Sequence, residues 1–379
     1  MTANGARYAV PMSSPSHLAP ARDPDPRLAS IVSLAEFEAI ARERMSPAAF
    51  DYVAGGAGDE ESLADNDAAW RRYRIRPRVL VDVSSVNLAT TLLGASVAMP
   101  LAVAPMASHG LAHPDAERAT ARAAAAAGVP FTLSTMSSHS IEEVATAAPD
   151  GVRWFQLYVQ EDRGYARSLV ERAEASGYRA IVLTVDLPVL GNRERDRRHG
   201  FVLDVPLGNF DGRPDPDVVR RSRPSALGGV RHASLTWHDL ETIRSWTRLP
   251  LVLKGILTAE DARLGVERGA AAIVVSNHGA RQVDRTVAPI DALEEVVAAV
   301  AGRAEVWVDG GVRRGLDIVI ARALGANAVL IGRPVLWALA TGAQAGVARA
   351  LELLEEECRL ALALIGAPDL GRIDRAHVR

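Results

Sequence analysis

The sequence predicts an α/β fold, a (β/α)8 barrel, because eight short apolar segments alternate with longer amphipathic segments from residue 101 onward. The apolar segments are rich in β-branched residues, are too short for helices, and do not alternate strictly between apolar and polar positions. Such runs are typical of parallel strands that are covered on both faces. The expected strands are 101–106, 130–135, 153–159, 180–186, 251–255, 272–277, 305–310 and 328–332.

Alanine-rich segments with helical periodicity lie between these strands. One of them begins after Pro114 and ends at Gly128, residue types that are common at the two ends of helices. A doubly wound open sheet is the alternative fold for this alternation, and its first strand is usually followed by the pattern GxGxxG. The chain has APMASHG at 104–110 instead, which favours the closed barrel, with strands from about 101 to 332.

Two regions depart from the alternation. Residues 1–30 contain five prolines and no periodicity, which predicts a disordered or loosely docked arm before a single domain at 31–379. That domain begins with a helical flank, in which Ser33 and Glu36 form a capping-box pattern. A second short helix is expected from Ser46 to Val53.

The interval between the fourth and fifth strands is the longest in the barrel, with 71 residues between their starting points at 180 and 251. Within it, 191–233 is rich in glycine, proline and arginine. A connection of this length is too long for a plain turn and predicts a lid over the site.

Composition places the chain among globular enzymes, with 379 residues, 48% hydrophobic and 23% charged, and a net charge of −3. There is no long basic run, so nucleic acid is not an expected partner. The single cysteine, Cys358, excludes an internal disulfide and a CxxC site, and no metal is expected. No apolar run approaches 18 residues and no secretory signal pattern opens the chain, so we expect a cytoplasmic protein without a membrane span.

In a (β/α)8 barrel the active site lies at the C-terminal ends of the strands, so polar residues at these ends are the candidates for chemistry. Lys254 ends the fifth strand. Its position alone allows a Schiff-base lysine, a cation beside an electron-rich cofactor, or a solvated residue. The other candidates at or just after strand ends are Ala107, Ser134, Gln156, Tyr158, Thr184, Asp186, Ser276, His278, Asp309 and Arg333.

Two motifs among these strand ends point to specific chemistry. SNHGARQ at 276–282 brings a candidate base, His278, close to Arg281, a pair that suits proton abstraction from an anionic substrate. Asp186 could orient that histidine. DGGVRRG at 309–315 and IGRP at 331–334 offer glycine backbone, arginines and a following helix, which together predict a phosphate site.

With these motifs, the chain resembles the FMN-dependent 2-hydroxy-acid oxidase and dehydrogenase family from about residue 33 to its end. The pairing of SNHGARQ with DGGVRRG at this interval is specific to that family. Further segments that carry the resemblance are DYVAGGAGDE (51–60), APMA (104–107), TLST (132–135), FQLYV (155–159), LTVD (183–186), LGNRERD (190–196) and LVLKGI (251–256).

The resemblance implies a role for each candidate residue. His278 would be the base, tuned by Asp186, and Tyr158 would bind the α-hydroxyl group. Arg193 and Arg281, with Tyr52, would bind the substrate carboxylate. The cofactor would be FMN, with Lys254 beside the pyrimidine edge of the flavin. The ring would further contact Ala107, Ser134, Gln156, Thr184 and Ser276, and the ribityl chain and phosphate would contact Asp309, Gly311, Arg313, Gly332 and Arg333.

The activity implied is oxidation of an L-2-hydroxy acid to the 2-keto acid, with reoxidation by oxygen to give hydrogen peroxide. A dehydrogenase that uses a quinone or protein acceptor is the alternative, and a Schiff-base lyase that uses Lys254 is a more distant one. Met136 and Val53 stand where glycolate oxidase has Trp and Tyr, so the resemblance implies that both line the side-chain end of the substrate pocket. These residue types predict a larger, apolar substrate side chain. Ala107 favours release of the keto acid. Family habit also implies a homo-oligomer, a tetramer or octamer.

Overall fold

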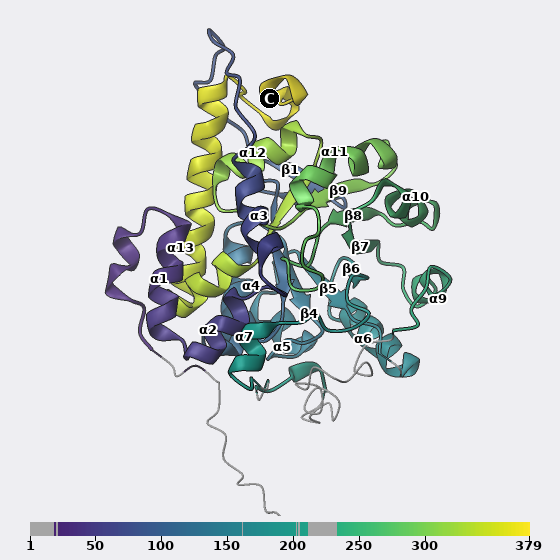
Figure 1. The fold of residues 1–379 in the computed structure, drawn as a ribbon. Helices are drawn as coiled ribbons and strands as arrows, with labels where there is room; N and C mark the ends of the chain where they lie inside the picture. The colour runs from purple at the N-terminus through teal and green to yellow at the C-terminus, as the bar shows by residue number, and fades with distance from the viewer. Residues whose placement is uncertain (1–18, 20–21, 161, 202, 204, 211–232) are drawn as a thin grey trace, which may run out of the picture.

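The computed structural model describes residues 19, 22–160, 162–201, 203, 205–210 and 233–379. Eight of its strands are parallel: β3 Leu101–Met106, β4 Phe131–Ser134, β5 Arg153–Leu157, β6 Ile181–Thr184, β7 Leu251–Ile256, β8 Ala272–Val275, β9 Glu305–Val308 and β10 Ala328–Ile331. They close into a barrel because β10 pairs with both β9 and β3 (Figure 1). The predicted (β/α)8 barrel is therefore confirmed, and each expected strand overlaps one of the eight.

Helices surround the barrel on its outside (Figure 1). They are α4 Ala116–Ala126, α5 Ile141–Ala147, α6 Arg163–Ala175, α9 Asp239–Arg244, α10 Ala259–Glu267, α11 Pro289–Val300, α12 Gly315–Ala323 and α13 Arg333–Ile365. The last of these is interrupted by non-helical backbone at Gly342 and Ala343. In the described part of the chain, no helix is both long enough and apolar enough to cross a bilayer.

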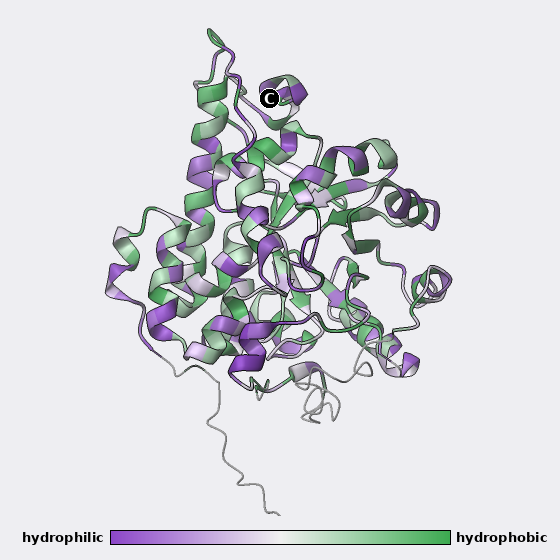
Figure 2. Ribbon diagram, in the orientation of Figure 1, coloured by the Kyte–Doolittle hydropathy of each residue, from purple (hydrophilic) through white to green (hydrophobic). Residues whose placement is uncertain are grey.

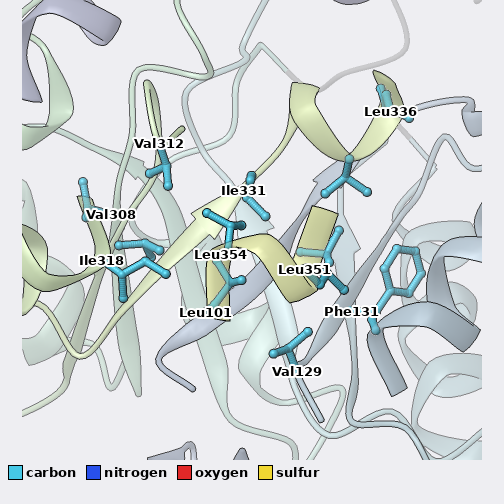
Figure 3. Close-up of a cluster of buried hydrophobic side chains, with 14 of the residues drawn as sticks. Leu101, Val129, Phe131, Val308, Val312, Ile318, Ile331, Leu336, Leu351 and Leu354 are labelled. Carbon is cyan, nitrogen blue, oxygen red and sulfur yellow. The ribbon is translucent and has the colours of Figure 1, made fainter. Parts of the chain in front are cut away.

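Two apolar layers hold the barrel together. The outer layer packs strands against helices, as where Leu351 and Leu354 of α13 lie against Leu101 and Ile331 of the barrel (Figure 3). The inner layer fills the barrel and contains Trp154 and Trp307, whose rings stack at 4.6 Å. Hydrophobic residues accordingly concentrate on the strands and hydrophilic ones on outer helical faces (Figure 2).

A short hairpin that the sequence analysis did not identify contributes to the inner layer. Its strands, β1 (Thr90–Leu92) and β2 (Ala95–Val97), pair antiparallel. Leu92 and Val97 belong to the same apolar cluster as the stacked tryptophans. The Leu93 N–H donates to the Glu305 carboxylate at 2.7 Å, which ties the hairpin to the start of β9.

The N-terminal flank consists of α1 Leu34–Arg44, α2 Pro47–Ala54 and α3 Glu61–Trp70. The predicted start of α1 is right, but the capping box is wrong. Ser33 Oγ accepts from the Ala35 N–H, and Glu36 Oε1 accepts from the Val32 N–H at 3.1 Å. Both side chains therefore satisfy backbone donors at the helix start, each one residue earlier than a capping box requires.

Parts of the predicted arm and lid can be described. In the arm, residues Pro26–Ser30 form a 3-10 helix, and the N–H of the buried Asp25 donates to the Thr341 carbonyl at 2.8 Å. Within the predicted lid, Glu194–Arg198 forms helix α7, and Gly208–Phe210 forms a 3-10 turn. The other parts of these two predictions, at 1–18, 20–21, 202, 204 and 211–232, lie outside the described residues.

Candidate active site

A cavity opens at the C-terminal ends of the barrel strands and brings together residues that are far apart in the sequence. Of the residues predicted for the site, those that line it are Tyr52, Tyr158, Thr184, Lys254, His278, Arg281, Asp309, Gly311, Arg313, Gly332 and Arg333. The other predicted residues, which are not among its described lining, are Ala107, Ser134, Met136, Gln156, Asp186, Arg193 and Ser276. Most of the latter contact residues that line the cavity.

His278 lies between a carboxylate and a phenol. Its Nδ1 is 2.7 Å from Asp186 Oδ1, and its Nε2 is 3.4 Å from the Tyr158 hydroxyl. Burial lowers the pKa of His278 below its usual value, although Asp186 acts in the opposite direction. Burial acts to raise the pKa of Asp186, but His278 and Lys254 outweigh it and keep that pKa low. A neutral imidazole with Nδ1–H bound to a carboxylate leaves Nε2 as the basic atom.

The close approach of Asp186 to β7 depends on Gly255, which the sequence analysis missed. Gly255 has φ of +112°, and a Cβ built there would lie 2.4 Å from Asp186 Cγ. Any larger residue would therefore displace the carboxylate that orients His278. The signal in the sequence was the glycine directly after Lys254.

Lys254 is the only lysine of the chain, and it is buried in an ion pair. Its Nζ lies 2.8 Å from Asp309 Oδ2 and donates to Ser276 Oγ, also at 2.8 Å. Burial acts to lower the pKa of Lys254, but Asp309 and Asp186 outweigh it and raise that pKa. The ammonium group is therefore charged, whereas a Schiff-base lysine must reach its neutral form to attack a carbonyl.

A row of polar side chains crosses the ends of β4, β5 and β6. Ser134 Oγ donates to Gln156 Oε1 at 3.1 Å, and Gln156 Nε2 donates to Thr184 Oγ1 at 3.0 Å. The neighbouring loops are joined to this row, because the Met136 N–H donates to Ser134 Oγ at 3.1 Å. The Met136 carbonyl in turn accepts from the Ser108 N–H at 3.0 Å, beside Ala107. Such a row suits the polar edge of a planar ring.

Two arginines meet near Tyr52. The Arg281 guanidinium donates to the Tyr52 carbonyl at 2.7 Å and lies 5.0 Å from the centre of the Tyr52 ring. Arg193 Nε donates to the Arg281 carbonyl at 3.3 Å. Asp196 lies in the field of both arginines, and burial raises its pKa against their lowering effect. This cationic end of the cavity suits a carboxylate ligand.

A second cationic region surrounds the glycine turns after β9 and β10. The half-buried Arg333 donates to three carbonyl oxygens, those of Val53 at 3.0 Å and of Gly55 and Gly279 at 2.8 Å. Burial, with Arg281 and Arg313 nearby, lowers the pKa of Arg333 to about 9. A buried cation whose donors meet neutral carbonyls is stabilised by an added anion such as phosphate.

The backbone at this region is held by an asparagine pair that the sequence analysis also missed. The amides of Asn66 and Asn277 exchange hydrogen bonds of 2.9 and 2.8 Å, which joins α3 to the end of β8. Gly311 has φ of +80°, and a Cβ there would lie 2.0 Å from the Asn66 carbonyl oxygen. No motif signalled Asn66, because its partner is 211 residues away.

Comparisons with known proteins identify the family of the chain. The sequence profile of the family described as FMN-dependent dehydrogenase matches residues 41–379. The chain is similar to L-lactate oxidase from Nostoc sp., at 52% identity over 360 residues, which is 93% of this chain and 99% of that protein. It is similar to glycolate oxidase from Spinacia oleracea, at 48% identity over 92% of this chain and 95% of that one.

The chain is also similar to solved structures of mandelate oxidase. The structure of mandelate oxidase with benzoyl-formic acid superimposes with a TM-score of 0.84, at 46% identity, covering 92% of this chain and 98% of that one. The structure of mandelate oxidase with (S)-2-phenylpropionate also has a TM-score of 0.84, at 47% identity over the same shares of the two chains.

The residues of the cavity fit a flavin mononucleotide. The row from Ser134 to Thr184 offers donors and acceptors to the edge of a ring, and Lys254 offers a buried positive charge. Asp309 has one buried carboxylate oxygen without a hydrogen-bond partner among the described residues. This oxygen could accept a hydrogen bond from a hydroxyl group of the ribityl chain. Arg333 supplies the positive charge for a phosphate. The chain therefore belongs to the FMN-dependent dehydrogenase family, and FMN is its cofactor.

Proposed function

We propose that this protein oxidises an L-2-hydroxy acid to the 2-keto acid and passes the two electrons to oxygen, which gives hydrogen peroxide. The class of reaction, FMN-dependent oxidation of a 2-hydroxy acid, follows from the family and from relatives named L-lactate oxidase and glycolate oxidase. The observation that carries the proposal is His278, held by Asp186 and Tyr158 close to the arginines that suit a carboxylate.

The proposal assigns each step of the reaction to a residue of the cavity or to one of its neighbours. His278 Nε2 takes the proton that leaves the substrate, and Asp186 stabilises the imidazolium that forms. Tyr158 orients the hydroxyl group, while Arg281 and Arg193 hold the carboxylate. FMN, when bound, accepts the two electrons that leave the α-carbon. Lys254 would hold a positive charge beside the ring when FMN is bound.

The substrate is proposed to carry a side chain larger and more apolar than that of glycolate. Val53 lines the cavity with an aliphatic surface, which supports this proposal. Mandelate oxidase, a structural relative, is described with the aromatic acid benzoyl-formic acid. Met136, which was expected at the same end, is buried beside Ser134 and is not among the described lining residues.

Anaerobic visible spectroscopy of the purified protein tests the proposal. A panel of L-2-hydroxy acids is added, and bleaching of the flavin bands by one member identifies the substrate class. Fast return of the colour in air supports an oxidase, and slow return supports a dehydrogenase. The variant His278→Gln should retain FMN but reduce it about 10²–10⁴-fold more slowly. If no hydroxy acid bleaches the wild type, or if His278→Gln is fully active, the proposal is wrong.

Borohydride trapping with substrate examines the lyase alternative. Because the chain has one lysine, any covalent adduct on a lysine side chain identifies Lys254.

The assembly and location are further proposals. A homo-oligomer, a tetramer or octamer, is supported by large apolar side chains exposed where the loop at Val79 and Leu80 lies beside the end of α13. In α13, Leu360 and Leu364 are 59% and 68% exposed. We also propose a cytoplasmic location on the grounds that the sequence provides, and cell fractionation tests it.

A further inference from the structure

We propose that Arg195 is a positioning residue, which holds helix α7 against α2 so that Tyr52 and Arg193 can bind the substrate carboxylate. The inference rests on the proposed function, because that function places the substrate carboxylate at the end of the cavity near Tyr52, Arg193 and Arg281. The group of side chains that does this, here named the α2–α7 latch, consists of Asp51, Glu60, Arg195 and His199.

The latch joins the long β6–β7 connection to the N-terminal flank through charged contacts. Arg195 Nη1 lies 3.4 Å from Asp51 Oδ1, and Nη2 pairs with the Glu60 carboxylate. The other oxygen of Asp51 lies 2.7 Å from His199 Nε2. Glu60 is itself fixed, because its Oε1 accepts from the Gly56 N–H at 2.8 Å. Each carboxylate thus links α7 to the backbone or helix that carries the site.

Both sides of the latch carry a residue proposed to bind the substrate. Tyr52 follows Asp51 in α2, and its ring stacks on Phe201 just after α7, at 4.7 Å and 23°. Arg193 directly precedes α7 and is its N-cap residue. The Asn192 carbonyl accepts from the Gly58 N–H at 2.9 Å. The position of Arg193 relative to Tyr52 is therefore set by how α7 sits on α2.

Helix α7 needs such contacts because of its length and composition. It has five residues, ERDRR, none of them fully buried, and is hydrophilic throughout (Figure 2). A helix this short is not stable alone, and it has no apolar face to dock. The latch side chains are 23% to 34% exposed, so each ion pair is partly solvated. The network as a whole, with the Tyr52–Phe201 stack, is what places the helix.

Arg198 provides a matched control on the same helix. It is also an arginine, but its side chain is 74% exposed and its ion pair is with Glu194, four residues earlier in α7. Removing either charge changes the net charge of α7 equally. Only the loss of Arg195 breaks the contact with α2.

The experiment compares Arg195→Met with Arg198→Met, using the hydroxy acid that bleaches the wild-type holoenzyme. We expect Arg195→Met to raise KM for this acid, and the dissociation constant of its keto acid, by about tenfold, because a small misplacement of the binding groups weakens the carboxylate contacts. The FMN content should be unchanged, and Arg198→Met should stay within about twofold of the wild type. Arg195→Lys keeps the charge and should lie between wild type and Arg195→Met.

Hydrogen exchange separates failure of the latch from failure of the proposed function. Amides of residues 194–201 should exchange faster in Arg195→Met and in Asp51→Asn than in the wild type or in Arg198→Met. This readout needs no turnover. A wild type that oxidises no hydroxy acid would refute the proposed function and, with it, the carboxylate role of the latch. Equal exchange and equal KM in Arg195→Met and Arg198→Met would refute the latch.

Discussion

At the scale of single residues, the site is governed by how burial and neighbouring charges compete. Burial works against the charged form of both His278 and Lys254, and both also have a carboxylate within 2.8 Å. For His278 burial prevails and the ring is neutral, while for Lys254 the two aspartates prevail and the ammonium is charged. A neutral base beside a fixed cation is the arrangement that proton removal and electron acceptance both require.

The lowered pKa of His278 predicts a pH profile. In the proposed function the neutral ring is the active base, so kcat/KM should rise with pH along an acid limb whose midpoint lies below the ordinary histidine value of about 6.5. Asp186 stabilises the protonated ring. Asp186→Asn should therefore move the limb to lower pH, while reducing the rate through lost orientation. The measurement is kcat/KM between pH 4 and 9, with stability checked at each pH.

Two outcomes would contradict this assignment. One is an acid limb above the ordinary histidine value in the wild type, which would mean that Asp186 outweighs burial. The other is a limb that moves upward in Asp186→Asn, since removing a carboxylate cannot favour the protonated ring.

At the scale of secondary-structure elements, the end of each barrel strand is shaped by backbone as much as by side chains. On β7, Lys254 and Gly255 are consecutive; Lys254 pairs with Asp309, and Gly255 leaves room for Asp186 beside His278. After β9, Gly311 allows α3 to approach the turn. These glycines matter because they leave space for a neighbouring segment. The residue type alone does not show which segment that is.

Gly255→Ala should therefore be more damaging than its size suggests. The added Cβ meets Asp186 Cγ at 2.4 Å, and φ of +112° is unfavourable for any L-residue. Gly302→Ala is the matched control, because Gly302 also has positive φ, +73°, but open space around its Cβ. The control should lose about 1–2 kcal/mol of unfolding free energy from backbone strain alone.

Thermal unfolding and flavin reduction measure the difference between these two variants. Gly255→Ala should be less stable than Gly302→Ala and should also reduce its flavin more slowly, because Asp186 is displaced from His278. If both variants lose the same stability and keep wild-type rates of flavin reduction, the space that Gly255 leaves for Asp186 is not needed for the reaction.

At the scale of the whole molecule, the barrel brings together at one mouth residues that lie between positions 52 and 336. On the outer surface of the molecule, most large apolar side chains are covered. Four of the exposed exceptions, Val79, Leu80, Leu360 and Leu364, lie on two segments joined by a hydrogen bond of 2.9 Å between the Arg78 N–H and the Ile365 carbonyl. A patch of this kind is typical of a surface that is buried between subunits.

The patch predicts the effect of a charge on assembly. Leu364→Glu, alone or with Leu80→Glu, should shift the protein to smaller species in light scattering coupled to size exclusion, because a carboxylate opposes burial of the patch. Val283→Glu is the control, since Val283 is as exposed as Leu364, at 68%, but belongs to neither of these two segments. A wild type that is monomeric at working concentrations would remove the reason for the prediction.

The sequence by itself determined the fold and most of the candidate site. The strands could be predicted because a parallel strand that is covered on both faces appears in the sequence as a short continuous apolar run. The rule that function lies at strand ends then selected residues such as Lys254, Asp309 and His278, which the structure places around one cavity. The sequence did not reveal the β1–β2 hairpin, because each of its strands has three residues and no lasting periodicity.

Only the tertiary structure decided which residues support these groups. The Asn66–Asn277 pair joins positions 211 residues apart, and Arg195 reaches Asp51 across 144 residues. Gly255 matters because Asp186, on another strand end, approaches it. Local patterns record the period of an element and the chemistry of a residue. They do not record which distant segment will lie against it, because that contact exists only once the barrel has closed.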